Sequence, residues 1–201
     1  MRLIDELKYR KKIFKERFSQ RLKEQNREDK FNKIRSGYDG SLFLLEGTKE
    51  QIDNLVFDIN PITGEKRFAI PEDIIFRIDY TNVDFDNAYI RGMDFTGMQN
   101  VYINPQTVFK NDLRDCILNG VYIIGPCDDA YITRTNFTNS IGALVDPSTV
   151  YDNDVRGTIL TDAVVVDNFS NAKMGDTVLD GASIITQEEK EILDGFCKIK
   201  E

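Results

Sequence analysis

The chain has 201 residues, of which 41% are hydrophobic and 30% are charged, and its formal net charge is −8. These values are typical of a folded globular protein and exclude a disordered chain. The lack of histidine excludes an imidazole base, a Ser-His-Asp triad and a histidine-ligated metal.

The first residues and the cysteines bear on the compartment. The chain is charged from Arg2 onward and shows no uninterrupted apolar core of the kind that a secretion signal has. Cys116, Cys127 and Cys197 form no C-x-x-C pair, so the sequence predicts neither a disulfide framework nor a zinc knuckle. We therefore expect a cytoplasmic protein with reduced thiols, no membrane span, no metal and no cofactor.

Residues 1–35 are predicted to be a basic amphipathic helical arm, with 13 Lys and Arg against 6 Asp and Glu. Apolar residues recur at helical spacing over residues 1–24, at Leu3, Leu7, Phe14, Phe18 and Leu22. The basic residues around this stripe are Lys8, Arg10, Lys11, Lys12 and Lys15. Such helices contact nucleic acid, an anionic membrane surface or a partner's groove. The narrow stripe instead favours packing on the rest of the protein, or on its twin in a homodimer.

Residues 36–69 predict a small α/β cap at the N-terminal end of the main body. A strand is expected over residues 41–45, and Thr48-Lys-Glu-Gln51 has the pattern that begins a short helix. A hairpin is expected around residues 61–64.

Residues 70–185 contain an internal repeat with a displacement of 42 residues. Ala88-Tyr89-Ile90 recurs as Ala130-Tyr131-Ile132, and the stretch 103–108 recurs as 145–150. Within this repeat, large apolar residues recur mostly every five positions, and many follow a small residue two positions earlier. Neither a helix nor a strand has that period. The pattern predicts a chain that turns a corner every five residues and points the large residue inward.

This motif resembles the pentapeptide repeat family, in which a small residue and Asp or Asn precede Leu or Phe. The best matches are Val83-Asp84-Phe85, Met93-Asp94-Phe95 and Thr135-Asn136-Phe137, and the resemblance covers about 115 residues. It implies an all-β solenoid, a right-handed quadrilateral β-helix, over residues 70–185. We expect this fold to carry helical N- and C-terminal flanks, because an exposed solenoid end needs a cap.

Residues 186–201 predict a C-terminal capping helix. Thr186 and Glu189 have the spacing of a capping box, and Ile192, Leu193 and Phe196 lie on one helical face. The resemblance implies an alternative, dimerisation through this end.

The carboxylates of the repeat predict a surface rather than a catalytic site. Residues 70–185 carry 17 Asp and Glu against 7 Lys and Arg, and the chain has no glycine-rich phosphate loop. Asp112 and Asp154 occupy the same repeat position, whereas a catalytic pair is expected to break the repeat. The predicted partner-binding acidic residues are Asp94, Asp112, Asp128, Asp129, Asp152 and Asp154. Tyr89 and Tyr131 are predicted to form an exposed aromatic column.

These observations predict a non-enzymatic protein-binding module. The acidic body excludes direct nucleic-acid binding by the repeat, because phosphate contacts need Lys and Arg. The resemblance includes bacterial quinolone-resistance proteins, and it implies an acidic DNA mimic that acts on a DNA-handling enzyme such as a topoisomerase. The alternative is a structural or adaptor protein that oligomerises or recruits a partner through its N-terminal helix.

Overall fold

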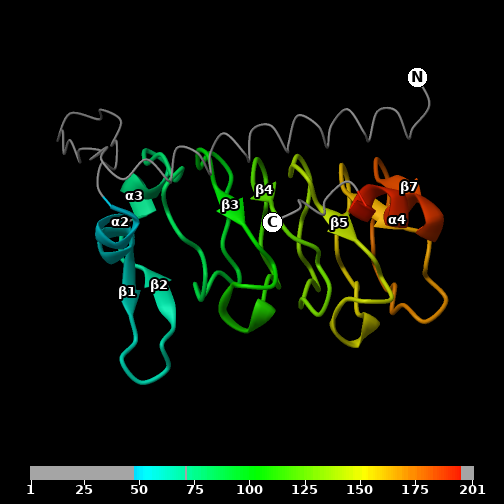
Figure 1. Ribbon diagram of the computed structural model, residues 1–201, viewed down its shortest axis with the longest axis horizontal. Coiled ribbons are helices and arrows are strands. Elements are labelled where there is room, and N and C mark those ends of the chain that lie inside the picture. Colours follow the sequence, from blue (N-terminus) through cyan, green and yellow to red (C-terminus); the bar gives the residue numbers. More distant parts are fainter. Residues whose placement is uncertain (1–47, 71, 196–201) are drawn as a thin grey trace.

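The computed structural model describes residues 48–70 and 72–195 (Figure 1). The strand expected over 41–45 and the helix expected over 1–24 lie outside the described residues. No helix in the described part of the chain is both long enough and apolar enough to cross a membrane.

The N-terminal end of the described chain contains a helix and a hairpin, both as expected. Helix α2 (Lys49–Val56) begins at a capping box, in which the N–H of Gln51 donates to Oγ1 of Thr48 at 3.2 Å and the N–H of Thr48 donates to Oε1 of Gln51 at 3.0 Å. Strands β1 (Phe57–Ile59) and β2 (Lys66–Phe68) pair in antiparallel fashion, and the short helix α3 (Glu72–Ile75) follows.

From β2 onward, each segment pairs in parallel with a segment that lies 19 to 23 residues later in the chain. Strand β3 (Tyr102–Ile103) pairs with β4 (Tyr122–Ile123). Strand β5 (Leu144–Val145) pairs with β6 (Val164–Val166), which pairs with β7 (Ser183–Ile185). Between these strands, neighbouring segments are joined by single parallel bridges, such as the bridge between Asp94 and Ile117.

The predicted fold class is wrong. The described residues form a small α/β structure whose short strands belong to separate sheets of two and three strands, and they contain no closed or solenoid sheet. An all-β solenoid, a right-handed quadrilateral β-helix, was expected over residues 70–185, whereas the described strands form no long runs of pairing. Residues with positive φ prevent such runs, because a strand needs extended backbone; Asp115 (φ 65°) and Asn139 (φ 58°) are two of them.

The predicted burial pattern at five-residue spacing is present in spite of this difference. Large residues of the series, including Phe95, Leu118 and Phe137, are completely buried, and so are small companions such as Ala130. Burial of these side chains removes apolar area from water at roughly 25 cal/mol per Å². The pattern weakens at the C-terminal end, where Ile184 is exposed.

Four small polar side chains, three of them completely buried and Thr177 half-buried, form a column along this core, and each donates to a backbone carbonyl of an earlier segment. The donor and acceptor pairs are Cys116 Sγ to Ile90 at 3.0 Å, Thr135 Oγ1 to Leu113 at 2.7 Å, Thr158 Oγ1 to Ile132 at 2.8 Å and Thr177 Oγ1 to Val155 at 2.7 Å. Because each of these donors has an acceptor, none of the four groups is left without a hydrogen bond inside the protein.

The 42-residue repeat is visible in the backbone and in the side-chain contacts. Two 3-10 helices, η1 (Phe109–Asn111) and η2 (Tyr151–Asn153), occupy equivalent positions and have central residues with φ of 57° and 56°. Oγ1 of Thr107 donates to Asp86, and Oγ1 of Thr149 donates to Asp128 in the same way. The repeat is therefore present in the structure as well as in the sequence.

The C-terminal end is covered by helix α4 (Gln187–Gly195), which begins after the predicted capping box. The N–H of Glu189 donates to Oγ1 of Thr186 at 3.2 Å. Nζ of Lys190 lies 2.8 Å from a carboxylate oxygen of Asp146, and these side chains are only 13% and 3% exposed. The repeat counterpart of Asp146 is Asn104, so a carboxylate stands where the helix needs an anionic partner.

Candidate functional site

Tyr89 and Tyr131 each lie beside an aromatic residue of the next segment. The rings of Tyr131 and Tyr151 are stacked with their centroids 3.9 Å apart and an angle of 25° between their planes. The rings of Tyr89 and Phe109 are tilted, with centroids 6.4 Å apart. Phe109 and Tyr151 are themselves 42 residues apart, so the same aromatic pair occurs twice.

A guanidinium group covers the tyrosine of each pair. Cζ of Arg67 lies 4.9 Å from the ring centroid of Tyr89, and Cζ of Arg114 lies 4.8 Å from that of Tyr131. Such cation–π contacts stabilise by about 0.5–1 kcal/mol at exposed positions. They hold the tyrosine rings in fixed orientations. The aromatic face, as we name it, consists of Arg67, Tyr89, Phe109, Arg114, Tyr131 and Tyr151.

Asp112 forms an ion pair with Arg114 of the aromatic face. Oδ1 and Oδ2 of Asp112 lie 2.8 and 2.5 Å from Nε and Nη2 of Arg114, and Asp112 is buried. This hydrogen bonding raises the pKa of Arg114. Asp154 forms the equivalent bidentate pair with Arg156, at 2.9 and 2.6 Å, and the hydrogen bond from Arg156 lowers the pKa of Asp154. Two of the predicted acidic residues are thus offset by bases of the same chain.

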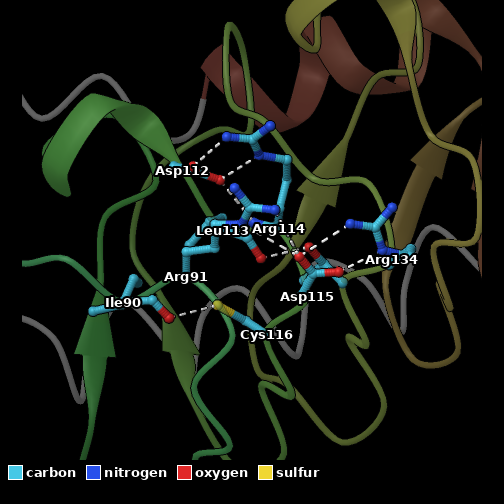
Figure 2. A network of polar contacts seen from close by, with 9 residues as sticks. Ile90, Arg91, Asp112, Leu113, Arg114, Asp115, Cys116 and Arg134 are labelled. Carbon is cyan, nitrogen blue, oxygen red and sulfur yellow. Dashed lines mark hydrogen bonds and ion pairs between the residues drawn. The ribbon is translucent and has the colours of Figure 1, made fainter.

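Asp115 joins three neighbouring segments through two arginines (Figure 2). Nη2 of Arg91 lies 3.3 Å from Oδ2 of Asp115, and Nη2 of Arg134 lies 3.1 Å from the same oxygen. The hydrogen bonds from Arg134, with a smaller contribution from Arg91, lower the pKa of Asp115. The stem of Arg134 lies over Gly157, where an added Cβ would be 3.0 Å from Cγ of Arg134. Glycine at that position makes room for the arginine.

The other predicted carboxylates are placed differently from one another. Asp152 is 61% exposed beside Tyr151, and one of its carboxylate oxygens lies 2.5 Å from Nζ of Lys173. Asp128 accepts a hydrogen bond from Thr149 and is followed by the exposed Asp129, so this pair lies just before Tyr131 in the chain. Asp94 is exposed on a segment that pairs with Ile117. Among the described bases, none forms an ion pair with Asp94, Asp128 or Asp129.

The described residues do not assemble the groups that metal or thiol chemistry needs. In residues 48–70 and 72–195 no group of three acidic or cysteine side chains is placed to hold a metal ion. The thiols of Cys116 and Cys127 are buried, and burial raises the pKa of each to about 12. A thiol with such a pKa supplies almost no nucleophilic thiolate at neutral pH.

Sequence reasoning missed several residues of this surface. Phe109 and Tyr151 could have been found from their displacement of 42 residues. The network of Asp115 had no such signal, because Arg134 corresponds in the repeat to a glycine, Gly92. The predicted basic residues of the arm lie outside the described residues; they are Lys8, Arg10, Lys11, Lys12 and Lys15.

Comparison with known proteins gives no further information on this surface. No family model matches the chain, and neither a curated protein nor a solved structure matches it.

Proposed function

We propose that the protein is a non-enzymatic protein-binding module that contacts its partner through the aromatic face. The observation that carries this proposal is the repeated unit in which a guanidinium covers a tyrosine that lies against a second aromatic ring. Tyrosine and arginine are enriched among the residues that dominate binding energy at protein interfaces. Here both residue types are held in place before binding, so less side-chain entropy is lost on association.

Charge around the aromatic face favours a partner with a basic surface. Asp128 and Asp129 lie three and two residues before Tyr131 and have no described base as ion-pair partner, and Asp152 is mostly exposed. Exposed carboxylates of this kind attract a cationic surface and repel an anionic one. A DNA-handling enzyme, for example a topoisomerase, has such a surface. The more specific form of the proposal is therefore an acidic DNA mimic.

Two further parts of the proposal rest on other features. The motif at residues 83–87 and its later copies support relationship to pentapeptide repeat proteins. The free cysteines Cys116 and Cys127 support a reducing compartment, the cytoplasm. The adaptor role of residues 1–35 stays a prediction, because those residues lie outside the described part of the chain.

The binding proposal is tested by affinity capture from nuclease-treated bacterial extract, with bound proteins identified by mass spectrometry. Tyr151→Ser should lose the partner that the unsubstituted protein captures. The matched control is Phe76→Ser, because Phe76 is 46% exposed and Tyr151 is 49% exposed, yet Phe76 does not belong to the aromatic face. Equal capture by the two variants would contradict the proposal.

DNA mimicry is tested separately on the captured complex. A mimic occupies the DNA site of its partner, so an excess of duplex DNA should release the partner, and Asp128→Asn with Asp129→Asn should weaken capture. If DNA releases nothing and the double variant captures normally, mimicry is wrong, while the aromatic face remains the contact surface.

A further inference from the structure

A second face of the structure carries apolar side chains that point away from the core. Tyr102, Tyr122, Leu144 and Val164 are half-buried, and the residue after each is buried. Because successive side chains of a strand point to opposite sides, these four residues point outward. The rings of Tyr102 and Tyr122 are stacked at 4.6 Å, and Ile141 pairs with Tyr122. We name these five residues the apolar face.

One end of the apolar face already packs against a helix. Leu193 of α4 is buried in a cluster with Val166 and Ile185, and the outward-pointing Leu144 and Val164 pack against that cluster. Figure 1 shows α4 next to β5 and β7 at the C-terminal end of the structure. The apolar stripe of an amphipathic helix therefore fits this surface. The rest of the face offers the same kind of side chain.

We propose that residues 1–24 of the same chain dock on the apolar face. The apolar residues of this segment, from Leu3 to Leu22, recur at helical spacing, so a helix would present them as one apolar stripe toward the apolar face. As a helix these residues would be about 36 Å long. From β3 to β6 the face spans three strand spacings, roughly 14 Å, so the segment is long enough to cover it.

The position where the described chain begins agrees with this docking. Thr48 precedes α2, which lies at the opposite end of the structure from α4 (Figure 1). A segment that precedes α2 can therefore run along the face toward the C-terminal end, and residues 25–47 are available as the connection.

Charge complementarity favours this segment as the occupant. Residues 1–24 carry 9 Lys and Arg against 4 Asp and Glu. The turns that lead into β6 and β7 carry the exposed Asp162 and Asp180, two and three residues before Val164 and Ser183. A basic rim around an apolar stripe matches an apolar row with acidic flanks. This inference is independent of the proposed function, because it concerns a different face.

The test uses tryptophan fluorescence of the full chain, which contains no native tryptophan. Phe14→Trp places a single reporter in the apolar stripe. We expect its emission to be blue-shifted relative to the denatured chain and protected from acrylamide. Adding Ile141→Asp should shift the emission to the red and raise the quenching constant several-fold. The matched control is Ile117→Asp, because Ile117 is 36% exposed and Ile141 is 37% exposed, but Ile117 lies on another face.

Each outcome decides the proposal. Release of the reporter by Ile141→Asp but not by Ile117→Asp, in a protein that sediments as a monomer, supports docking within one chain. Equal effects of the two substitutions, or no effect of either, overturn it. A blue shift that disappears on dilution together with a dimer identifies a second copy as the occupant and also overturns it. If Ile141→Asp lowers the melting temperature, Ile141→Ser gives the same comparison with a milder change.

Discussion

The buried polar column predicts a measurable loss of stability for Thr158→Val. The hydroxyl of Thr158 is completely buried and donates to the carbonyl of Ile132 at 2.8 Å. Valine has nearly the same shape as threonine, so the substitution removes the hydrogen bond without leaving a cavity. The carbonyl of Ile132 keeps one hydrogen bond, from the N–H of Thr135 at 3.0 Å. We therefore expect a loss of about 1 kcal/mol in the free energy of unfolding.

For a chain of this length, about 1 kcal/mol corresponds to a decrease of roughly 2–4 °C in melting temperature. The assay is thermal and urea unfolding of the full chain, followed by circular dichroism. Thr161→Val is the matched control, since the hydroxyl of Thr161 donates to the carbonyl of Asp180 at the same distance of 2.8 Å, but at the surface. Water replaces that hydrogen bond, so the control should change stability very little.

The reasoning is refuted if Thr158→Val is as stable as the unsubstituted protein, or if both threonine variants lose the same amount. Either result would mean that the hydrogen bonds inside the core do not contribute beyond the packing of the side chains that make them.

Three other predictions concern ion pairs and thiols. Because its arginine partners lower the pKa of Asp115 below the ordinary value of 3.8, its ion pairs stabilise the fold above that value and lose their effect as pH falls through the lowered pKa. Asp115→Asn should therefore cost up to about 1 kcal/mol at neutral pH and nothing in strong acid, and a pH-independent cost in urea unfolding would contradict this. The second prediction uses a variant in which the third cysteine is replaced by serine. Because the pKa of Cys116 and of Cys127 is raised to about 12, these thiols should react with a disulfide reagent at pH 8 only after denaturation. Fast reaction of the folded protein would show that they are accessible. Asp146→Asn should cost about 3 kcal/mol, since it removes the carboxylate from a mostly buried ion pair with the lysine of α4. Asp152→Asn removes an exposed pair and should cost less than about 1 kcal/mol, and equal costs in urea unfolding would be the contrary result.

The sequence predicted local features well where one residue type determines them. Capping boxes at Thr48 and Thr186 were found because side-chain oxygens and backbone N–H groups three residues apart must meet. The burial of residues such as Phe95 and Phe137 followed from their spacing of five within the repeat. The fold class did not follow from the same pattern, because inward spacing does not determine how many consecutive residues pair as strands.

The candidate site was predicted only in part, for a related reason. Tyr131 was expected on the surface, but its contact with Tyr151 depends on which segment lies next to it, and the repeat alone does not give that neighbour. Asp112 was predicted as a partner-binding acidic residue, because sequence proximity to Arg114 does not show whether the two side chains meet with bidentate geometry. The charge of a surface follows from such pairings, not from the number of carboxylates.

The equivalent contacts of Thr107 and Thr149 show that the structure repeats after 42 residues. Residues 88–129 and the residues that follow them pair with neighbouring segments at equivalent repeat positions. A second copy of 88–129 inserted after residue 129 would therefore meet neighbours of the right shape on both sides. Two further strand spacings would lengthen the molecule by roughly 10 Å. An insertion one residue shorter would instead turn the large apolar residues toward water. The protein can therefore be lengthened by whole units, and its capped ends determine where the series stops.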